Sequence, residues 1–251
     1  ELKPRGVMLC ISPWNFPLAI FLGQTTAALA AGNAVIAKPS EKSGLTAHLL
    51  VQLMHSCGFT ENLVQLINCP GQQVSEELLP DPRISGVMFT GSTATGTSIA
   101  RRIAQRSGVR IPLIAETGGQ NCMLVDSTAL PEQVVKDVVT SGFRSAGQRC
   151  SALRVLYLQE EIADRVITMI AGAMRELRIG DPARVFTDIG PVIDSEAVTA
   201  LQQHVLYMEE HGRLIYQCSL TEECERGHFF APRLYEIENI SCLAGEVFGP
   251  I

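Results

Sequence analysis

Short apolar runs alternate with longer segments of helical period along the first half of the chain. The apolar runs are typical of buried strands, and the segments between them have the length and the apolar spacing of helices. The runs lie at 7–11, 33–37, 63–67 and 86–89, and the helical segments at 18–31, 43–57 and 93–107. This alternation predicts βαβ units, and so an α/β fold with a Rossmann-like parallel sheet and helices on both faces.

A second α/β unit is predicted to begin near the glycine pair Gly118-Gly119. A strand at 111–115 breaks there before another strand at 121–125. A helix that starts at Pro131 follows, because proline suits the first helical turn. Further along, the pattern predicts a strand at 153–158, a helix that ends near residue 177 and a helix at 194–211. We therefore expect two domains, 1–117 and 118–251.

Composition excludes several classes of protein. The 251 residues are 46% hydrophobic and 18% charged, as in a soluble globular protein. A formal net charge of −6 disfavours a nucleic-acid partner. No apolar run reaches the ~18 residues of a membrane span, and the start of the chain does not resemble a signal peptide. Eight cysteines without a CxxC pair indicate reduced thiols and a cytoplasmic protein.

Metal ligands are not expected, because the five histidines form no HExxH motif. Three stretches at predicted strand ends carry other candidate chemistry. Gly91 and Ser92 open a helix whose N-terminus could meet a pyrophosphate, or they form a plain tight turn. Lys38 and Glu41 could hold a ribose diol, or belong to a solvated turn. Asn15, preceding Phe16, could donate to an oxyanion, or lie in a hydrophobic turn.

Cys150 stands out among the cysteines by its position at a predicted junction between a helix and a strand. A thiol nucleophile must be accessible and partly ionised, and this junction allows access. No histidine lies near it in the sequence, so a cysteine protease has no visible base. Glu116 could supply a carboxylate base if the fold brings the loops together.

Six stretches occur in one order: PWNFP, KPSE, FTGS, ETGGQ, GQRC and EVFGP. In that order they resemble the aldehyde dehydrogenase superfamily, and the resemblance covers essentially the whole chain. The agreement at 114–121 and 145–152 is similar to the aldehyde dehydrogenase part of the bacterial proline utilization A family. That part oxidises L-glutamate γ-semialdehyde, so the resemblance implies this small-molecule substrate, proline catabolism and NAD as cofactor.

The resemblance also implies a role for each matched residue. Cys150 would attack the aldehyde, Asn15 and the Cys150 backbone N–H would hold the oxyanion, and Glu116 would activate the water that hydrolyses the thioester. The remaining residues would bind ligands: Lys38 and Glu41 the adenine ribose, Gly91 and Ser92 the pyrophosphate, Glu246 and Phe248 the nicotinamide ribose region, and Ser151 and Phe16 the substrate.

Two departures from the family pattern are Thr117 and Gln120, which replace the commoner leucine and lysine. Family members are nearly twice as long and form oligomers. We therefore expect a fragment, inactive alone, of a homo-oligomeric protein: 1–117 as part of the NAD-binding domain and 118–251 as part of the catalytic domain. The alternatives are a non-catalytic dinucleotide-binding or structural module, an aldehyde dehydrogenase for another substrate, and a cysteine acyltransferase that needs no nicotinamide.

Overall fold

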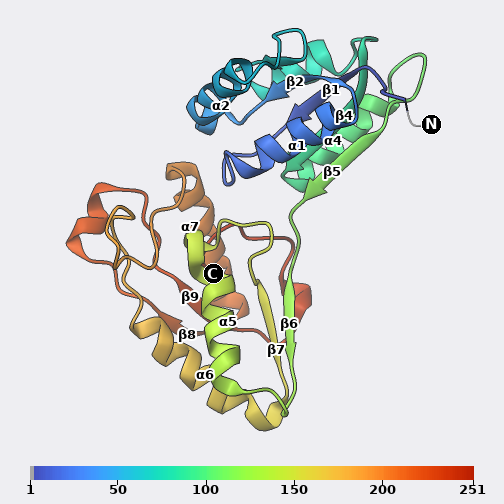
Figure 1. Ribbon diagram of the computed structural model, residues 1–251. Coiled ribbons are helices and arrows are strands. Elements are labelled where there is room, and N and C mark those ends of the chain that lie inside the picture. The colour runs from blue at the N-terminus through green and yellow to red at the C-terminus, as the bar shows by residue number, and fades with distance from the viewer. Residues whose placement is uncertain (1–2) are drawn as a thin grey trace. The chain divides into compact units, whose positions relative to one another are not determined.

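The computed structural model describes residues 3–251. The chain divides into two compact units, unit 1 up to Gly118 and unit 2 from Gly119 to Ile251 (Figure 1). The functional assignment of these parts, as NAD-binding and catalytic domains, stays a prediction.

Unit 1 is built on five parallel strands in the order β3-β2-β1-β4-β5. The strands are β1 (Val7–Ile11), β2 (Ala34–Lys38), β3 (Val64–Leu66), β4 (Ile84–Gly91) and β5 (Leu113–Thr117). The helices are α1 (Ala19–Ala30), α2 (Gly44–Ser56), α3 (Gly71–Gln73), which continues into a π-helical turn (Val74–Leu78), and α4 (Thr93–Ala104), with a 3-10 turn at Glu41–Ser43. The prediction of a Rossmann-like α/β fold is confirmed.

Alternation of side chains along the strands gives unit 1 a core on each face of its sheet. Met8 and Cys10 of β1 pack in one cluster with residues of α1 and α2. Leu9, between them, packs in the other cluster with Val87 of β4 and Ile99 of α4. Burial on both faces explains why these strands are nearly continuous apolar runs in the sequence.

A buried asparagine fixes the entrance to β1. The Asn33 Oδ1 accepts hydrogen bonds from the backbone N–H groups of Arg5, at 2.7 Å, and Gly6, at 3.1 Å. Its Nδ2 donates to the carbonyl oxygen of Ala28 at 3.1 Å. The amide thus ties the end of α1 to the start of the central strand.

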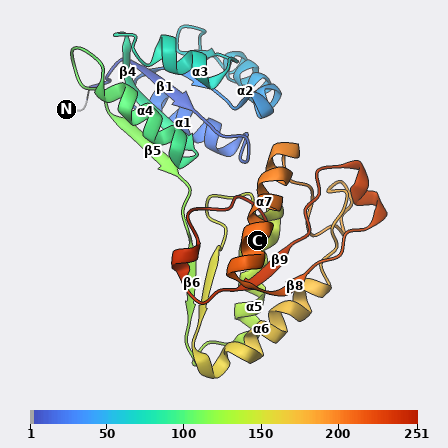
Figure 2. The ribbon, with the colours of Figure 1, turned by 180° about the vertical axis from the view of Figure 1, so that it is seen from behind.

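Unit 2 combines a parallel strand pair with an antiparallel hairpin. Its strands are β6 (Cys122–Val125) and β7 (Val155–Leu158), which are parallel, and β8 (Arg213–Gln217) and β9 (Arg233–Glu236), which are antiparallel. Its helices are α5 (Pro131–Phe143), α6 (Glu160–Arg175) and α7 (Ser195–His211), with 3-10 turns at Arg144–Gly147, Glu222–Arg226 and Ile240–Cys242. Figures 1 and 2 show α5 and α6 side by side, and both contribute to one core.

The hairpin of β8 and β9 has no counterpart in the sequence predictions. Leu214, Ile215 and Tyr216 are apolar at consecutive positions, so the alternation of a half-buried strand is missing. The connection between the strands is long and contains a 3-10 turn instead of a two-residue hairpin turn. The hairpin therefore depends on packing against the core of unit 2, which includes Cys218 and Phe230 from this connection.

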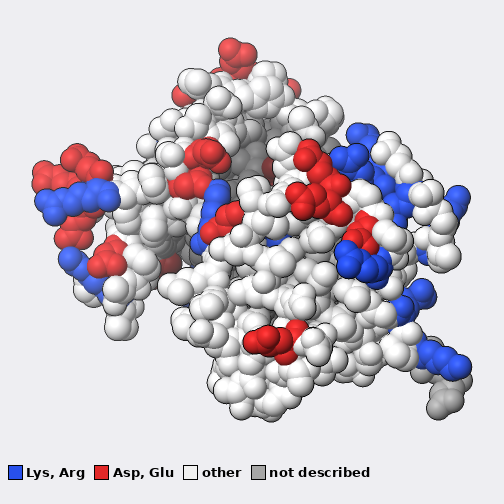
Figure 3. Space-filling view, turned by 90° about the horizontal axis from the view of Figure 1, so that it is seen from above, with Lys and Arg blue, Asp and Glu red and all other residues white. Residues whose placement is uncertain are grey.

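The surface carries charges of both signs. On the face that Figure 3 shows, Lys and Arg side chains lie among Asp and Glu side chains, and uncharged residues cover most of the area. None of the helices within residues 3–251 has both the length and the apolar character that crossing a bilayer requires.

Candidate active site

The candidate residues of unit 1 lie at one edge of its sheet. Carboxyl ends of parallel strands meet at the same edge, and ligands of open α/β sheets bind there, where the strand order reverses. In unit 1 the order reverses between β1 and β4. Asn15 and Phe16 follow β1, Gly91 ends β4 and Ser92 follows it, while Lys38 ends β2 and Glu41 follows closely.

Lys38 and Glu41 form an ion pair at the end of β2. The Lys38 Nζ lies 2.9 Å from Glu41 Oε1, and the Lys38 side chain is 6% exposed whereas that of Glu41 is 51% exposed. Partial burial opposes ionisation of Glu41, but a backbone hydrogen bond and the bond and charge of Lys38 together lower its pKa. The pair thus presents an anchored ammonium and a solvent-facing carboxylate, which together offer donors and acceptors to a diol.

A cavity of about 600 Å³ opens next to this pair. Its lining combines apolar side chains, such as those of Ile11, Val74 and Ile99, with the charged side chains of Lys38, Glu76 and Arg102. Pockets of this size hold small ligands, and apolar side chains together with several polar groups suit a ring system that carries a hydroxylated sugar. The residues present therefore fit the adenosine part of a dinucleotide.

Gly91 and Ser92 make a tight transition from β4 into α4. A Cβ atom on Gly91 would lie 2.7 Å from Phe89 Cζ, so a larger residue would displace that ring. The Ser92 side chain caps α4, because its Oγ accepts a hydrogen bond from the Thr95 N–H at 3.2 Å. Other N–H groups of the first helical turn have no acceptor within the helix and are suited to an anion.

Asn15 and Phe16 are half-buried in the loop between β1 and α1. Glu116 is exposed and lies within β5, where it pairs in register with Thr90 of β4. The strand expected at 111–115 therefore runs two residues further, to Thr117, because pairing with β4 continues as far as Gly91.

The candidate nucleophile of unit 2 follows an unusual backbone turn. Ser145 and Ala146 have φ values of 57° and 52°, and Gly147 has 66°. Left-handed conformations are costly for residues other than glycine, so packing must hold this turn in place. Cys150 comes three residues later, half-buried, and Ser151 next to it is exposed. Cys150 thus lies at the expected junction, between α5 with its 3-10 extension and β7.

Residues 145–154 form the loop around Cys150, called the nucleophile loop below. Two side chains with no role predicted from the sequence, Asn121 and Gln148, fix its backbone. The Asn121 Nδ2 donates to the carbonyl oxygens of Cys150, at 2.7 Å, and Ala152, at 2.9 Å. The Gln148 Nε2 donates to Ser145 O at 3.1 Å and its Oε1 accepts from the Ile193 N–H at 2.8 Å. In the sequence, the position of Asn121 directly after Gly118-Gly119-Gln120 could have marked it as a candidate. No spacing in the sequence indicates that its partners are the carbonyls of Cys150 and Ala152.

Arg154 connects the nucleophile loop to the residues proposed for the nicotinamide ribose. Its guanidinium donates to the carbonyls of Arg149, at 3.1 Å, and Gly249, at 3.0 Å, and lies 3.1 Å from Glu246 Oε1. It also lies 5.6 Å from the centroid of the Phe248 ring. Burial lowers the pKa of Arg154, and the Glu246 carboxylate opposes that shift. The structure therefore brings Glu246 and Phe248 together with the Cys150 loop.

Two further contacts hold the segment 243–250. Gly147 approaches it so closely that a Cβ atom on Gly147 would clash with the carbonyl oxygen of Gly249. Gln120, which replaces the commoner lysine, donates from Nε2 to Gly245 O at 3.0 Å. A glycine and a glutamine at these positions thus let two distant parts of unit 2 meet.

Two cysteines, Cys10 and Cys218, are more deeply buried than Cys150. Burial raises the pKa of the Cys10 thiol to about 12 and that of Cys218 to about 11. Both therefore stay protonated and inert at neutral pH. Within residues 3–251, no group of three or more His, Cys, Asp or Glu side chains could hold a metal ion.

Curated proteins of known sequence match nearly the whole chain. The bifunctional protein PutA of Escherichia coli is 52% identical over 257 residues, which cover 99% of this chain and 20% of that protein. The 1-pyrroline-5-carboxylate dehydrogenase of Bacillus cytotoxicus is 34% identical over 253 residues, covering 99% of this chain and 49% of that enzyme. The chain thus spans about a fifth to a half of these relatives.

A solved structure agrees with the fold. A crystal structure of proline utilization A from Bradyrhizobium japonicum, in a mutant form, has a TM-score of 0.95 and 52% identity. It covers 99% of this chain, which corresponds to 25% of that protein. The model of the aldehyde dehydrogenase family matches residues 1–251. The chain belongs to the aldehyde dehydrogenase family.

Proposed function

We propose that the chain is part of a longer protein that oxidises L-glutamate γ-semialdehyde to L-glutamate with NAD, in proline catabolism. Family membership supports the reaction class. The identity of 52% to a bifunctional protein PutA and of 34% to a 1-pyrroline-5-carboxylate dehydrogenase supports the substrate. Hydrolysis of the cyclic imine 1-pyrroline-5-carboxylate opens its ring and gives L-glutamate γ-semialdehyde. Residues 1–251 alone are proposed to be inactive.

The observation that carries the proposal is the ordered loop around Cys150. The Asn121 amide and the Arg154 guanidinium hold the peptides next to a half-buried thiol. Attack by the Cys150 thiolate on the aldehyde carbon would form a C–S bond and place the carbonyl electrons on oxygen. The Cys150 backbone N–H and the Asn15 side-chain amide are assigned as donors to this oxyanion.

NAD, when bound, would accept the hydride from the thiohemiacetal carbon. Lys38 and Glu41 would hold the adenine ribose, Gly91 and Ser92 the pyrophosphate, and Glu246 and Phe248 the nicotinamide ribose. The ion pair and the cavity beside it support the first of these assignments. The solvent-facing Glu41 carboxylate favours NAD, because it accepts from a 2′-hydroxyl and repels a 2′-phosphate.

Glu116 is assigned the deacylation step. An exposed carboxylate in β5 can take a proton from water, whose oxygen then attacks the thioester and releases the Cys150 thiolate. Ser151, exposed next to the nucleophile, is assigned a hydrogen bond to the substrate carboxylate, and Phe16 is assigned a contact with the substrate chain.

NADH formation with L-glutamate γ-semialdehyde, measured in the longer protein, tests the proposal. Cys150→Ala should abolish turnover, whereas Cys57→Ala, an exposed cysteine of unit 1, should leave it unchanged. Glu116→Gln should give a burst of NADH followed by a slow steady state, because hydride transfer precedes deacylation. Turnover in Cys150→Ala would refute the assignment, and activity restricted to other aldehydes would refute the substrate.

Oligomeric state and location belong to the same proposal. The family resemblance supports a homo-oligomer and a cytoplasmic protein. Light scattering of the longer protein at several concentrations measures the first, and fractionation of cells measures the second.

A further inference from the structure

The peptide bond between Arg149 and Cys150 is held on its carbonyl side. The Arg149 oxygen accepts one hydrogen bond from Arg154 Nη2, at 3.1 Å, and one from the Ala152 N–H, at 3.0 Å. The N–H of the same peptide belongs to Cys150. Carbonyl and N–H point in opposite directions in a planar trans peptide, so fixing the carbonyl also fixes the direction of the Cys150 N–H.

The following peptide is fixed as well. The Cys150 carbonyl accepts a hydrogen bond of 2.7 Å from Asn121 Nδ2. Both peptides that flank the nucleophile therefore have a side-chain donor on their carbonyl oxygen. Of the two donors, only Arg154 is charged, and a charged donor polarises a peptide and strengthens its N–H as a donor in turn.

The same guanidinium reaches the segment 246–249 through Glu246 and the Gly249 carbonyl. The Arg154 side chain is 3% exposed, and a planar guanidinium with several partners has little freedom to turn. A shift of one segment would break a bond to the other. Arg154 thus fixes the position of the Arg149–Cys150 peptide relative to the segment that contains Glu246 and Phe248.

We propose that Arg154 is a positioning residue that aligns the Cys150 N–H for an oxyanion and holds Glu246 and Phe248 in a fixed position relative to Cys150. The inference rests on the proposed function for the identity of the nucleophile. It concerns the acyl chemistry of Cys150, so it is testable without aldehyde or nicotinamide.

Two reagents separate oxyanion stabilisation from reactivity of the thiolate. With p-nitrophenyl acetate, the Cys150 thiolate adds to the ester carbonyl, the carbonyl electrons move onto oxygen, and the C–O bond to p-nitrophenolate then breaks. With iodoacetamide, the C–S bond forms as iodide leaves, and no oxyanion develops. Only the first reaction needs an aligned N–H donor.

The experiment compares both rates in the longer protein, with the Cys150→Ala rates subtracted. Arg154→Met should slow acylation by the ester about tenfold or more and change alkylation by less than about threefold. Arg154→Lys should restore part of the acylation rate, because lysine keeps the charge but cannot donate to every partner at once. If Arg154→Met does not fold, the split between the two rates in Arg154→Lys decides.

Arg106→Met is the matched control. Arg106, in unit 1, also donates to backbone carbonyls, those of Leu79, Asp81 and Ile84. Its loss should lower stability and leave the ratio of the two rates unchanged. Equal loss of both rates in the Arg154 variants, unchanged rates, or no Cys150-dependent acylation in the unaltered protein would overturn the proposal. If the Arg154 variants show the split but the unaltered protein forms no NADH, the proposed function alone is refuted.

Discussion

The two units hold their candidate residues by different means. In unit 1 the residues sit at the ends of strands, where backbone pairing of the parallel sheet places them at one edge. In unit 2 the candidate nucleophile, Cys150, lies in an irregular loop whose carbonyls accept hydrogen bonds from the side chains of Asn121 and Arg154. We therefore expect substitutions near the site to be tolerated better in the regular sheet of unit 1 than in the loop of unit 2, which single side chains hold.

The largest effect is expected for Gly147→Ala in unit 2. A residue with a Cβ at φ 66° is strained by about 1–2 kcal/mol, and overpacking adds about 1–3 kcal/mol. We expect unfolding by urea to show a loss of about 2–5 kcal/mol, with faster hydrogen exchange across the nucleophile loop.

Gly172→Ala, in α6 of the same unit, is the control for this prediction. A Cβ there would meet nothing within 4 Å, and alanine should stabilise the helix by up to about 1 kcal/mol. Equal stability of the two variants would contradict the close approach of Gly147 to Gly249.

Two asparagines, one in each unit, are expected to give effects of intermediate size. Asn33 in unit 1 and Asn121 in unit 2 both use side-chain amides to fix backbone. Either substitution by alanine should lower stability by about 1–3 kcal/mol, because backbone groups lose their partners. Only Asn121→Ala should also slow acylation of Cys150, by about tenfold. Equal effects of both variants on acylation would contradict a specific role of Asn121 in positioning the Cys150 peptide.

A smaller effect is expected at the edge of unit 1. Glu41→Gln should reduce the preference for NAD over NADP by about tenfold, because the exposed carboxylate is partly screened by solvent. Dissociation constants of both cofactors measure it by calorimetry. Glu61→Gln, which changes an exposed carboxylate elsewhere in unit 1, should leave the preference unchanged. An unaltered ratio in Glu41→Gln would remove Glu41 from the ribose site.

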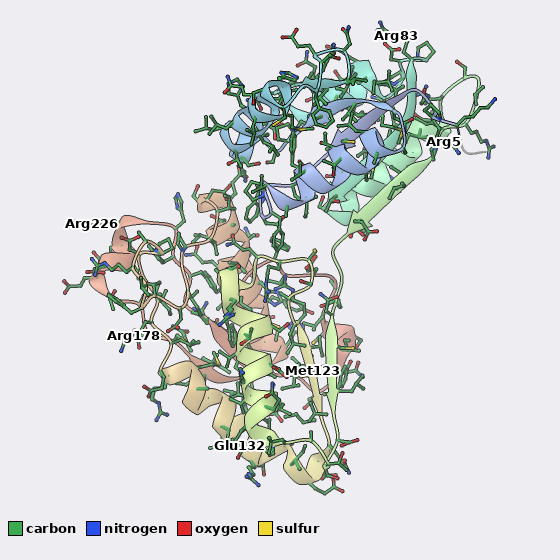
Figure 4. All side chains as sticks on the ribbon, in the orientation of Figure 1. Arg5, Arg83, Met123, Glu132, Arg178 and Arg226 are labelled. Carbon is green, nitrogen blue, oxygen red and sulfur yellow. The ribbon has the colours of Figure 1, made fainter. Side chains whose placement is uncertain are left out.

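The smallest expected effect concerns the surface pair of Asp81 and Arg83, 2.6 Å apart. Figure 4 shows Arg83 at the periphery of unit 1. The hydrogen bond from the Arg83 side chain lowers the pKa of Asp81 from 3.8 to about 2. Since the folded-state pKa is the lower one, the pair stabilises the protein above about pH 4, and this contribution is lost as the pH falls through about 2.

Asp81→Asn tests this sign. The variant should have a slightly lower Tm than the unaltered protein at neutral pH, and the difference should vanish between about pH 4 and pH 2. A difference that grows on acidification would contradict the assignment.

Unit 1 was more predictable than unit 2, for a physical reason. Strands such as β1 and β4 are buried on both faces, and their sequences are therefore nearly continuous apolar runs that can be recognised without the structure. The partners of Arg154 depend on contacts across long stretches of chain, which no local pattern records. The motif around Cys150 predicts a nucleophile there, whereas the side chains that hold its loop could be identified only from the three-dimensional arrangement.

The reach of Arg154 has a consequence for biosynthesis. Its contacts with Glu246 and Gly249 close chain separations of 92 and 95 residues. Closing such long loops carries an entropic cost, and a growing polypeptide cannot make these contacts before the later segment has left the ribosome. The nucleophile loop should therefore gain its final order late in synthesis, after the sheet of unit 1 has had time to form.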